Sequence, residues 1–308
     1  SRRNITLSIN IIAEIGVNHN GDLNLALEMI DEAKLAGADI VKFQSFKADS
    51  LATAGARKAN YQLEIDANET QYQMLKRLEL SEDMHHKIIE HCDRNNIDVL
   101  FSPFDVDDVI FLNELGLKFF KIPSGEIVNV PYLRLIGEIA DKVIISSGMS
   151  TSDEIKNALS ILSEGKRLDK SNIVLLHCTT EYPAPLSEVN LKAITTLKAQ
   201  FGNEVGYSDH TEGVEAAIAA AALGASVIEK HFTLNKNFPG PDHKASMEPG
   251  LFKEMVNGIR RVESALGDGQ KKPTKTELKN ILVVRKFIVA KAKILKGELL
   301  TSSNIVGK

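Results

Sequence analysis

The feature that most constrains the fold is a regular alternation of short β-rich runs with longer amphipathic segments. Several runs are continuously apolar, which is typical of parallel strands covered on both faces. Gly37, Gly116 and Gly224 each follow a helical pattern, where helix C-termini favour glycine. Eight strand–helix units in about 250 residues predict an α/β fold, a (β/α)8 or TIM barrel. The expected strands are Ile11–Ile15, Ile40–Gln44, Val99–Ser102, Phe119–Ile122, Val143–Ser146, Ile173–Cys178, Val205–Tyr207 and Val227–Glu229.

An open doubly wound sheet is the alternative. It would carry a glycine-rich phosphate loop after an early strand, and the sequence has no GxGxxG pattern. The segment between the second and third strands is unusually long, and Ala48–Lys58 within it is expected to form a loop over the active face. The clearest predicted helices are Leu23–Ala36, Asp83–Arg94, Asp107–Leu115, Ser152–Ser163 and Gly213–Leu223.

The pattern changes near residue 268. We expect a catalytic barrel over residues 1–268 and a polar linker, partly helical, over residues 269–285. Residues 286–308 include the strand-like run Phe287–Ala290 and are too few for an independent core.

Bulk properties exclude some classes of function. A net charge of -4 argues against nucleic acid as the main partner. No apolar stretch reaches about 18 residues, so we expect no membrane span. The two cysteines lack metal-site spacing, which indicates reduced thiols and a cytoplasmic protein.

Polar residues end every predicted strand, at the face where barrels carry their active sites. His210 and His231 end neighbouring strands near acidic residues and could together bind a divalent metal ion. The alternative is that each is a hydrogen-bonded core histidine. Other polar residues at these ends are Glu14, Ser102, Ser124, Ser146, Thr180, Tyr182, Ser208 and Glu229.

Lys42 and Lys121 lie inside otherwise apolar strands, where a lysine is costly unless it is paired or placed in a polar cavity. One of them could form a Schiff base, as in aldolases. Together, with nearby serines, they could instead clamp a phosphate or carboxylate, and two lysines favour this reading. A snorkelling lysine at a strand edge is the structural alternative.

Asp242 lies in the rigid loop Phe238–His243, directly after the last strand. It could contact a polyol substrate or transfer a proton. An aspartate in an ordinary turn is the alternative.

Nine motifs occur in an order that closely resembles the N-acetylneuraminate (sialic acid) synthase family, which includes bacterial legionaminic and pseudaminic acid synthases. The resemblance covers nearly the whole chain. The motifs are Ala13–Gly21, Val41–Gln44, Phe101–Phe104, Lys121–Glu126, Ser146–Met149, His177–Pro183, Tyr207–Thr211, Glu229–Thr233 and Gly240–His243.

The resemblance implies metal-dependent condensation of phosphoenolpyruvate with N-acetylmannosamine or a related sugar, with phosphate released by C–O cleavage. The alternative sugar is the diacetamido-trideoxy substrate of legionaminic or pseudaminic acid synthases. His210 and His231 would hold Mn2+, or else Mg2+ or Co2+. Glu14, Tyr182 and Asp242 would face the sugar. Phosphoenolpyruvate would be held by Lys42, Ser102, Lys121, Ser124, Ser146, Ser208 and Glu229, with Thr180, where the family often has Asn, nearby.

The resemblance also implies a C-terminal antifreeze-like domain, swapped between the subunits of a homodimer, of which residues 286–308 are the beginning. Two readings of other classes stay open: an aldolase that forms a Schiff base with pyruvate, and a non-catalytic barrel that serves in binding or dimerisation.

Overall fold

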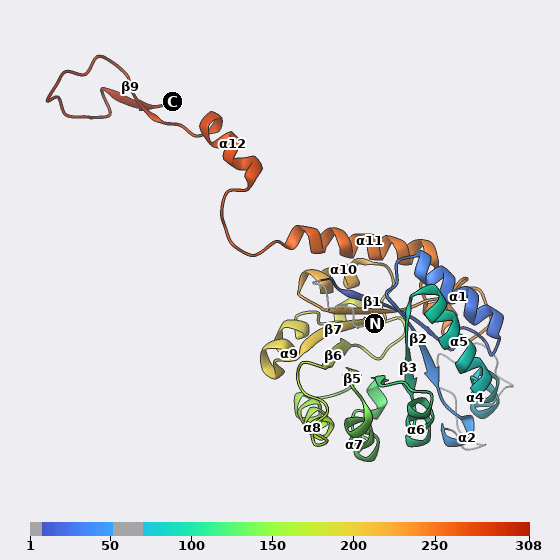
Figure 1. The fold of residues 1–308 in the computed structure, drawn as a ribbon. Helices are drawn as coiled ribbons and strands as arrows, with labels where there is room; N and C mark the ends of the chain where they lie inside the picture. The colour runs from blue at the N-terminus through green and yellow to red at the C-terminus, as the bar shows by residue number, and fades with distance from the viewer. Residues whose placement is uncertain (1–7, 52–69) are drawn as a thin grey trace. The chain divides into compact units, whose positions relative to one another are not determined.

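The computed structural model describes residues 8–51 and 70–308. In this part of the chain, parallel strands close into a barrel in sequence order, which confirms the predicted (β/α)8 fold (Figure 1). Every predicted strand is present, most of them with one to three additional residues. The barrel strands are β1 (Asn10–Gly16), β2 (Ile40–Ser45), β3 (Asp98–Pro103), β4 (Phe119–Ile122), β5 (Lys142–Ser146), β6 (Ile173–Cys178), β7 (Glu204–Asp209) and β8 (Val227–His231).

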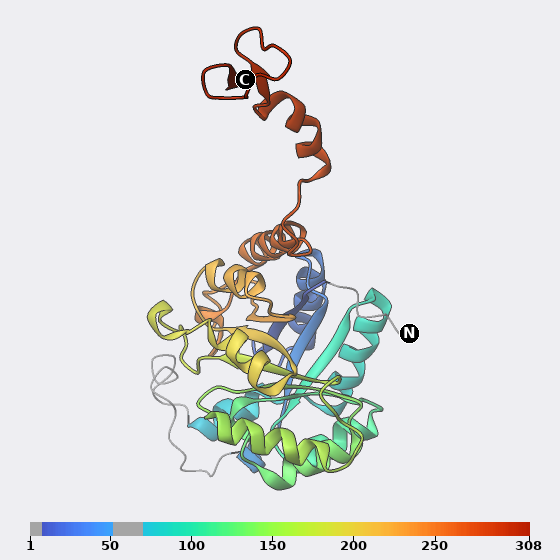
Figure 2. The same ribbon diagram turned by 90° about the vertical axis from the view of Figure 1, so that its left-hand side faces the viewer.

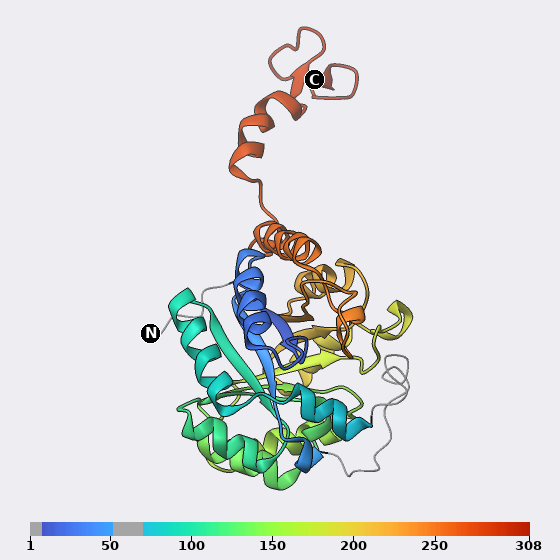
Figure 3. The same cartoon turned by 90° about the vertical axis from the view of Figure 1, so that its right-hand side faces the viewer.

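Helices surround this barrel (Figure 2). Neighbouring helices pack together, as Figure 3 shows for α1 and α5. The helices of this part of the chain are α1 (Leu23–Leu35), α2 (Ala48–Leu51), α4 (Gln71–Leu78), α5 (Glu82–Asn95), α6 (Val106–Glu114), α7 (Val130–Ile139), α8 (Ser152–Ser163), α9 (Ala193–Phe201), α10 (Glu215–Ala222) and α11 (Pro249–Leu266). Short 3-10 turns lie at Ser124–Glu126, Leu186–Glu188 and His243–Ala245.

Local sequence explains where α1 begins and ends. Asp22 caps it by accepting from the N–H groups of Asn24 and Leu25. Gly37 follows the helix with a φ of 99°, a conformation that side chains resist. The buried residues Ala26, Met29, Ile30 and Ala33 recur at helical spacing and form the face that packs on the barrel.

The loop predicted over Ala48–Lys58 needs one correction. Its first residues form the short helix α2, with Ala48 fully buried. The remainder, residues 52–58, lies outside the described residues. The helix α4 follows, started by a capping box in which Thr70 and Gln73 satisfy each other's backbone N–H groups.

Two apolar clusters fill the barrel unit. The larger one lies between the strands and the surrounding helices. A second cluster occupies the alternate strand positions, including Ile12, Ile40, Leu100 and Val227, and fills the barrel interior. Because strand side chains alternate, the next inward position on these strands lies two residues further toward the carboxyl end.

Residues 266–308 form a separate compact unit. It contains α12 (Lys275–Val284), within the range predicted as a linker, and a two-stranded antiparallel sheet of β9 (Ile288–Ala290) and β10 (Ile305–Gly307). Among the described helices, none is long and apolar enough to span a membrane.

Candidate active site

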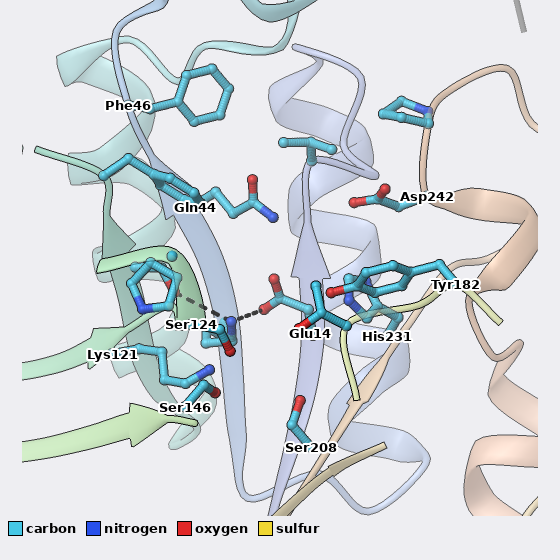
Figure 4. Close-up of a pocket in the computed structure, with 18 of the residues that line it drawn as sticks. Glu14, Gln44, Phe46, Lys121, Ser124, Ser146, Tyr182, Ser208, His231 and Asp242 are labelled. Atoms are coloured by element: carbon cyan, nitrogen blue, oxygen red, sulfur yellow. Dashed lines mark hydrogen bonds and ion pairs between the residues drawn. The ribbon is translucent and has the colours of Figure 1, made fainter. Parts of the chain in front are cut away.

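A cavity of about 440 Å³ lies at the carboxyl ends of the barrel strands. Every site residue predicted from the sequence lines it. Figure 4 shows Lys121, Ser124 and Ser146 on one side and Tyr182, His231 and Asp242 on the other. The structure therefore brings together side chains from all parts of the barrel.

Strand alternation explains this convergence. Several of the polar residues stand two positions beyond an inward apolar residue of the same strand, so they also point inward, at the mouth of the barrel. Glu14 follows Ile12, Lys42 follows Ile40, and Ser102 follows Leu100 in this way. On β8, Glu229 and His231 continue the inward row that Val227 begins.

Two lysines and two glutamates form a buried charge quartet on the cavity floor, consisting of Glu14, Lys42, Lys121 and Glu229. Lys42 Nζ lies 2.9 Å from Glu14 Oε2 and 3.7 Å from Glu229 Oε2. Lys121 Nζ donates to both carboxylate oxygens of Glu229 at 3.1 Å. The side chains are at most 6% exposed, so each charge depends on the others for compensation.

The quartet shifts the pKa of each member. Burial opposes charge on Glu229, but Lys121 and Lys42 outweigh it and hold the pKa of Glu229 below its usual range. Burial also opposes charge on Lys42, yet Glu14 and Glu229 raise its pKa. For Glu14 and Lys121 burial prevails, which raises the pKa of Glu14 and lowers that of Lys121. Glu14 is therefore the carboxylate of the quartet that gains a proton more readily.

Hydroxyl groups complete the floor. Lys42 Nζ donates to Ser102 Oγ at 3.3 Å, and Ser208 Oγ donates to Glu229 Oε1 at 2.9 Å. Ser124 Oγ accepts from the N–H of Gly148 at 3.0 Å. A Cβ on Gly148 would lie 2.3 Å from Thr180 Oγ1, so only glycine fits between these hydroxyls.

His210 and His231 lie side by side, with ring centroids 5.5 Å apart. His210 Nδ1 donates to the carbonyl of Thr179 at 2.6 Å, which leaves a lone pair on Nε2. His231 Nδ1 is buried and has no hydrogen-bond partner in the described part of the chain. Burial lowers the pKa of His210 to about 4 and that of His231 well below its usual value, so both rings are neutral near pH 7.

Neutral imidazoles with available nitrogens fit a metal ion. Within residues 8–51 and 70–308, however, no group of three His, Cys, Asp or Glu side chains could hold one. The two histidines can therefore supply only part of a coordination sphere, and substrate or water oxygens would have to supply the rest.

Tyr182 and Asp242 border the histidines. The Tyr182 ring lies 4.2 Å from that of His210, centroid to centroid, and meets that of His231 edge-on at 5.6 Å. Asp242 is half-buried. Burial, and after it the charge of Glu14, raises the pKa of Asp242 to about 7. This carboxyl group can exchange a proton near neutral pH.

Sequence reasoning missed an entire apolar side of the cavity. It consists of Val17, Phe46, Met74, Leu75, Leu78 and Phe104, which we call the apolar wall. Val17 and Phe104 fall within two of the motifs, but no residue of the wall stands out as functional, because apolar side chains at helical or strand spacing resemble ordinary core. The amphipathic pattern of α4 was the available signal.

Comparisons with known proteins identify the family of the chain. The NeuB family profile matches residues 29–271. The N,N'-diacetyllegionaminic acid synthase of Campylobacter jejuni is 55% identical over 97% of this chain and 89% of its own length. The N-acetylneuraminate-9-phosphate synthase of Homo sapiens is 38% identical over 97% of this chain and 82% of its own.

A solved structure supports the same assignment. The crystal structure of the N-acetylneuraminic acid synthetase of Leptospira borgpetersenii aligns with a TM-score of 0.79 and 35% identity, covering 90% of this chain and 91% of that one. The family profile and these relatives span the barrel and its cavity, and the chain belongs to the NeuB family.

Proposed function

We propose that this protein condenses phosphoenolpyruvate with a 2-acetamido sugar of the mannose type to form a nonulosonic acid. The observation that carries the proposal is one cavity that combines two lysines, several hydroxyls and two neutral histidines. The lysines and hydroxyls suit the binding of a small phosphorylated carboxylate. The histidines suit a metal ion that activates a carbonyl group.

Phosphoenolpyruvate would lie over the quartet floor. Lys42 and Lys121 would face its phosphate and carboxylate, and the hydroxyls of Ser102, Ser124, Ser146 and Ser208 would fix its orientation. Because a Cβ on Gly148 would collide with the hydroxyls of Thr180 and Ser124, glycine would keep both hydroxyls in position for the phosphate.

The sugar would lie beside Tyr182, Asp242 and the histidines. Mn2+, or alternatively Mg2+ or Co2+, held by His210 and His231 would polarise the aldehyde carbonyl of the open-chain sugar. Tyr182 would pack on the sugar and shield the reacting carbon from water. Asp242, with its pKa near 7, would donate a proton to the oxygen that was the aldehyde.

The bond changes follow from these positions. The C3 carbon of phosphoenolpyruvate bonds to the aldehyde carbon, and positive charge develops at C2. Glu229, kept anionic by its two lysines, stabilises that charge. Water then adds to C2, and one of its protons returns to Asp242. The C2–O bond breaks, C2 becomes the ketone carbon, and inorganic phosphate leaves with the second proton.

The relatives' names bear on the choice of sugar. Those from Campylobacter jejuni and Legionella pneumophila, 55% and 45% identical, are both N,N'-diacetyllegionaminic acid synthases. This favours the diacetamido-trideoxy sugar over N-acetylmannosamine itself.

Phosphate release is the decisive assay. Phosphoenolpyruvate plus the acetamido sugar should give phosphate, and a chelator or His210→Ala should abolish it while circular dichroism stays unchanged. Chelator-resistant activity would refute the metal role. Borohydride trapping of pyruvate on a lysine would instead favour the aldolase, and no turnover with any acetamido sugar would favour a binding module.

We also propose that residues 286–308 begin an antifreeze-like domain, that the protein is a domain-swapped homodimer, and that it is cytoplasmic. A monomeric mass in light scattering at micromolar concentration would contradict the dimer.

A further inference from the structure

The apolar wall forms a hydrophobic cluster of its own, separate from the two clusters that fill the barrel unit. Val17, Phe46, Met74 and Leu78 are buried, and Leu75 and Phe104 pack against them. The rings of Phe46 and Phe104 meet edge to face with centroids 6.0 Å apart. Because every member of this cluster also lines the active-site cavity, the wall is a surface for a ligand as well as a packing element.

The wall lies away from the reacting groups. Figure 4 shows Phe46 above Gln44, at the opposite end of the view from Ser208. The reacting aldehyde lies, under the proposed function, near His231 and the quartet floor. The far end of an open-chain sugar would therefore extend toward the wall.

The described residues that line the cavity offer no free cation to a phosphate at that far end. Among the described lining residues, the cations are Lys42 and Lys121, and both belong to the floor and are paired with glutamates. A phosphate or hydroxyl that is buried against apolar side chains loses its hydrogen bonds to water without gaining new ones. A methyl group loses nothing there.

Two amides border the wall. Gln44 and Gln71 line the cavity, and both side chains are half-buried there. An amide paired with an amide satisfies both a donor and an acceptor. An acetamido substituent of the substrate would fit here, because its methyl group could pack on the apolar wall while its amide pairs with the glutamine side chains.

We propose that the apolar wall determines sugar specificity, selecting a substrate whose far end carries a methyl group and a second acetamido group in place of hydroxyls or a phosphate. This inference rests on the proposed function and deepens it. Phe46, Leu75 and Phe104 act by contact with the substrate and take no part in the bond changes.

The test compares four sugars with phosphoenolpyruvate in the phosphate-release assay. They are N-acetylmannosamine, its 6-deoxy analogue, its 6-phosphate and 2,4-diacetamido-2,4,6-trideoxymannose. The wild type should prefer the 6-deoxy analogue to N-acetylmannosamine by about 10- to 100-fold in kcat/KM, the range that an apolar pocket achieves against one hydroxyl. The trideoxy sugar should be better still, and the 6-phosphate worst.

A substitution in the wall should reduce this preference. Leu75→Gln places an amide on the wall at a half-buried position and should lower the 6-deoxy preference at least about fivefold. Leu27→Gln makes the same change at a half-buried residue of α1 outside the cavity and should leave the preference unchanged.

The outcomes separate the two proposals. Absence of phosphate release with all four sugars would overturn the proposed function. Turnover with equal or better use of N-acetylmannosamine or its 6-phosphate would overturn the wall's role alone. If Leu75→Gln fails to fold, the preference of the wild type among the four sugars still tests the role of the wall.

Discussion

Asp209 and Lys230 form a buried ion pair on β7 and β8, beside the residues that line the cavity. Lys230 Nζ donates to Asp209 Oδ2 at 2.8 Å and also to the carbonyl of Thr211. Asp209 Oδ1 accepts from the N–H and the hydroxyl of Thr211 at 2.9 and 2.8 Å. Strand alternation places the pair on the opposite face from Ser208 and Glu229, where it fixes the strand ends that carry both histidines.

Removing one member of this ion pair should destabilise the protein strongly. Asp209 is 1% exposed and Lys230 2%, so Lys230→Met leaves a carboxylate without a counter-ion in a place that water does not reach. The free energy of unfolding should fall by about 3–5 kcal/mol. Adding Asp209→Asn removes the second charge. The double variant should therefore recover at least about 1–2 kcal/mol relative to Lys230→Met.

Urea unfolding at pH 7, followed by circular dichroism with the denaturant slope compared between variants, measures these differences. Lys198→Met is the matched control, because Lys198 pairs with Glu204 at 3.3 Å with both side chains about half exposed. The Lys198→Met substitution should lower the free energy of unfolding by at most about 1 kcal/mol. The reasoning is refuted if Lys230→Met is as mild as the control, or if the double variant is no more stable than Lys230→Met.

Three further predictions concern the cavity. Lys121→Met removes one cation of the floor and should raise the KM for phosphoenolpyruvate about 10- to 100-fold in the phosphate-release assay; a change below twofold would contradict the anion clamp. Asp242, with a pKa raised to about 7, should impose an ionisation near pH 7 on kcat/KM that Asp242→Asn lacks. Because the folded protein holds this proton more tightly than the unfolded chain, wild-type stability relative to Asp242→Asn should fall as the pH rises from about 4 to 7, measured by urea unfolding. Gly148→Ala places a methyl group 2.3 Å from Thr180 Oγ1 and should raise the same KM about 10- to 100-fold, whereas Gly250→Ala, with open space around it, should not.

The barrel and its charged floor could be predicted from the sequence for a physical reason. Continuous apolar runs identify buried strands. A charged residue inside such a run destabilises the fold unless other groups compensate its charge, so it indicates a polar or functional site. Lys42 and Lys121 stand out on that ground, and the structure places both in the quartet. The histidines stand out because two neighbouring strands end in them.

The apolar wall could not be predicted in the same way. Its members come from the turn after β1, the loop after β2, the helix α4 and the loop after β3, which meet only in the folded chain. Burial of an apolar side chain is not penalised, so nothing in the sequence pattern distinguishes Met74 or Leu78 from core residues. Function in such residues becomes visible only once the cavity they line is known.

The charge quartet also affects how the protein binds its substrate. In their charged forms, Glu14, Lys42, Lys121 and Glu229 sum to zero, so the empty barrel can fold without a net buried charge. An arriving multivalent anion upsets this balance, and proton uptake at Glu14, whose pKa is already raised, would restore part of it. Capture of phosphoenolpyruvate should then be a proton-linked event, with heats of binding that depend on the ionisation enthalpy of the buffer and an affinity that weakens as the solution becomes more alkaline.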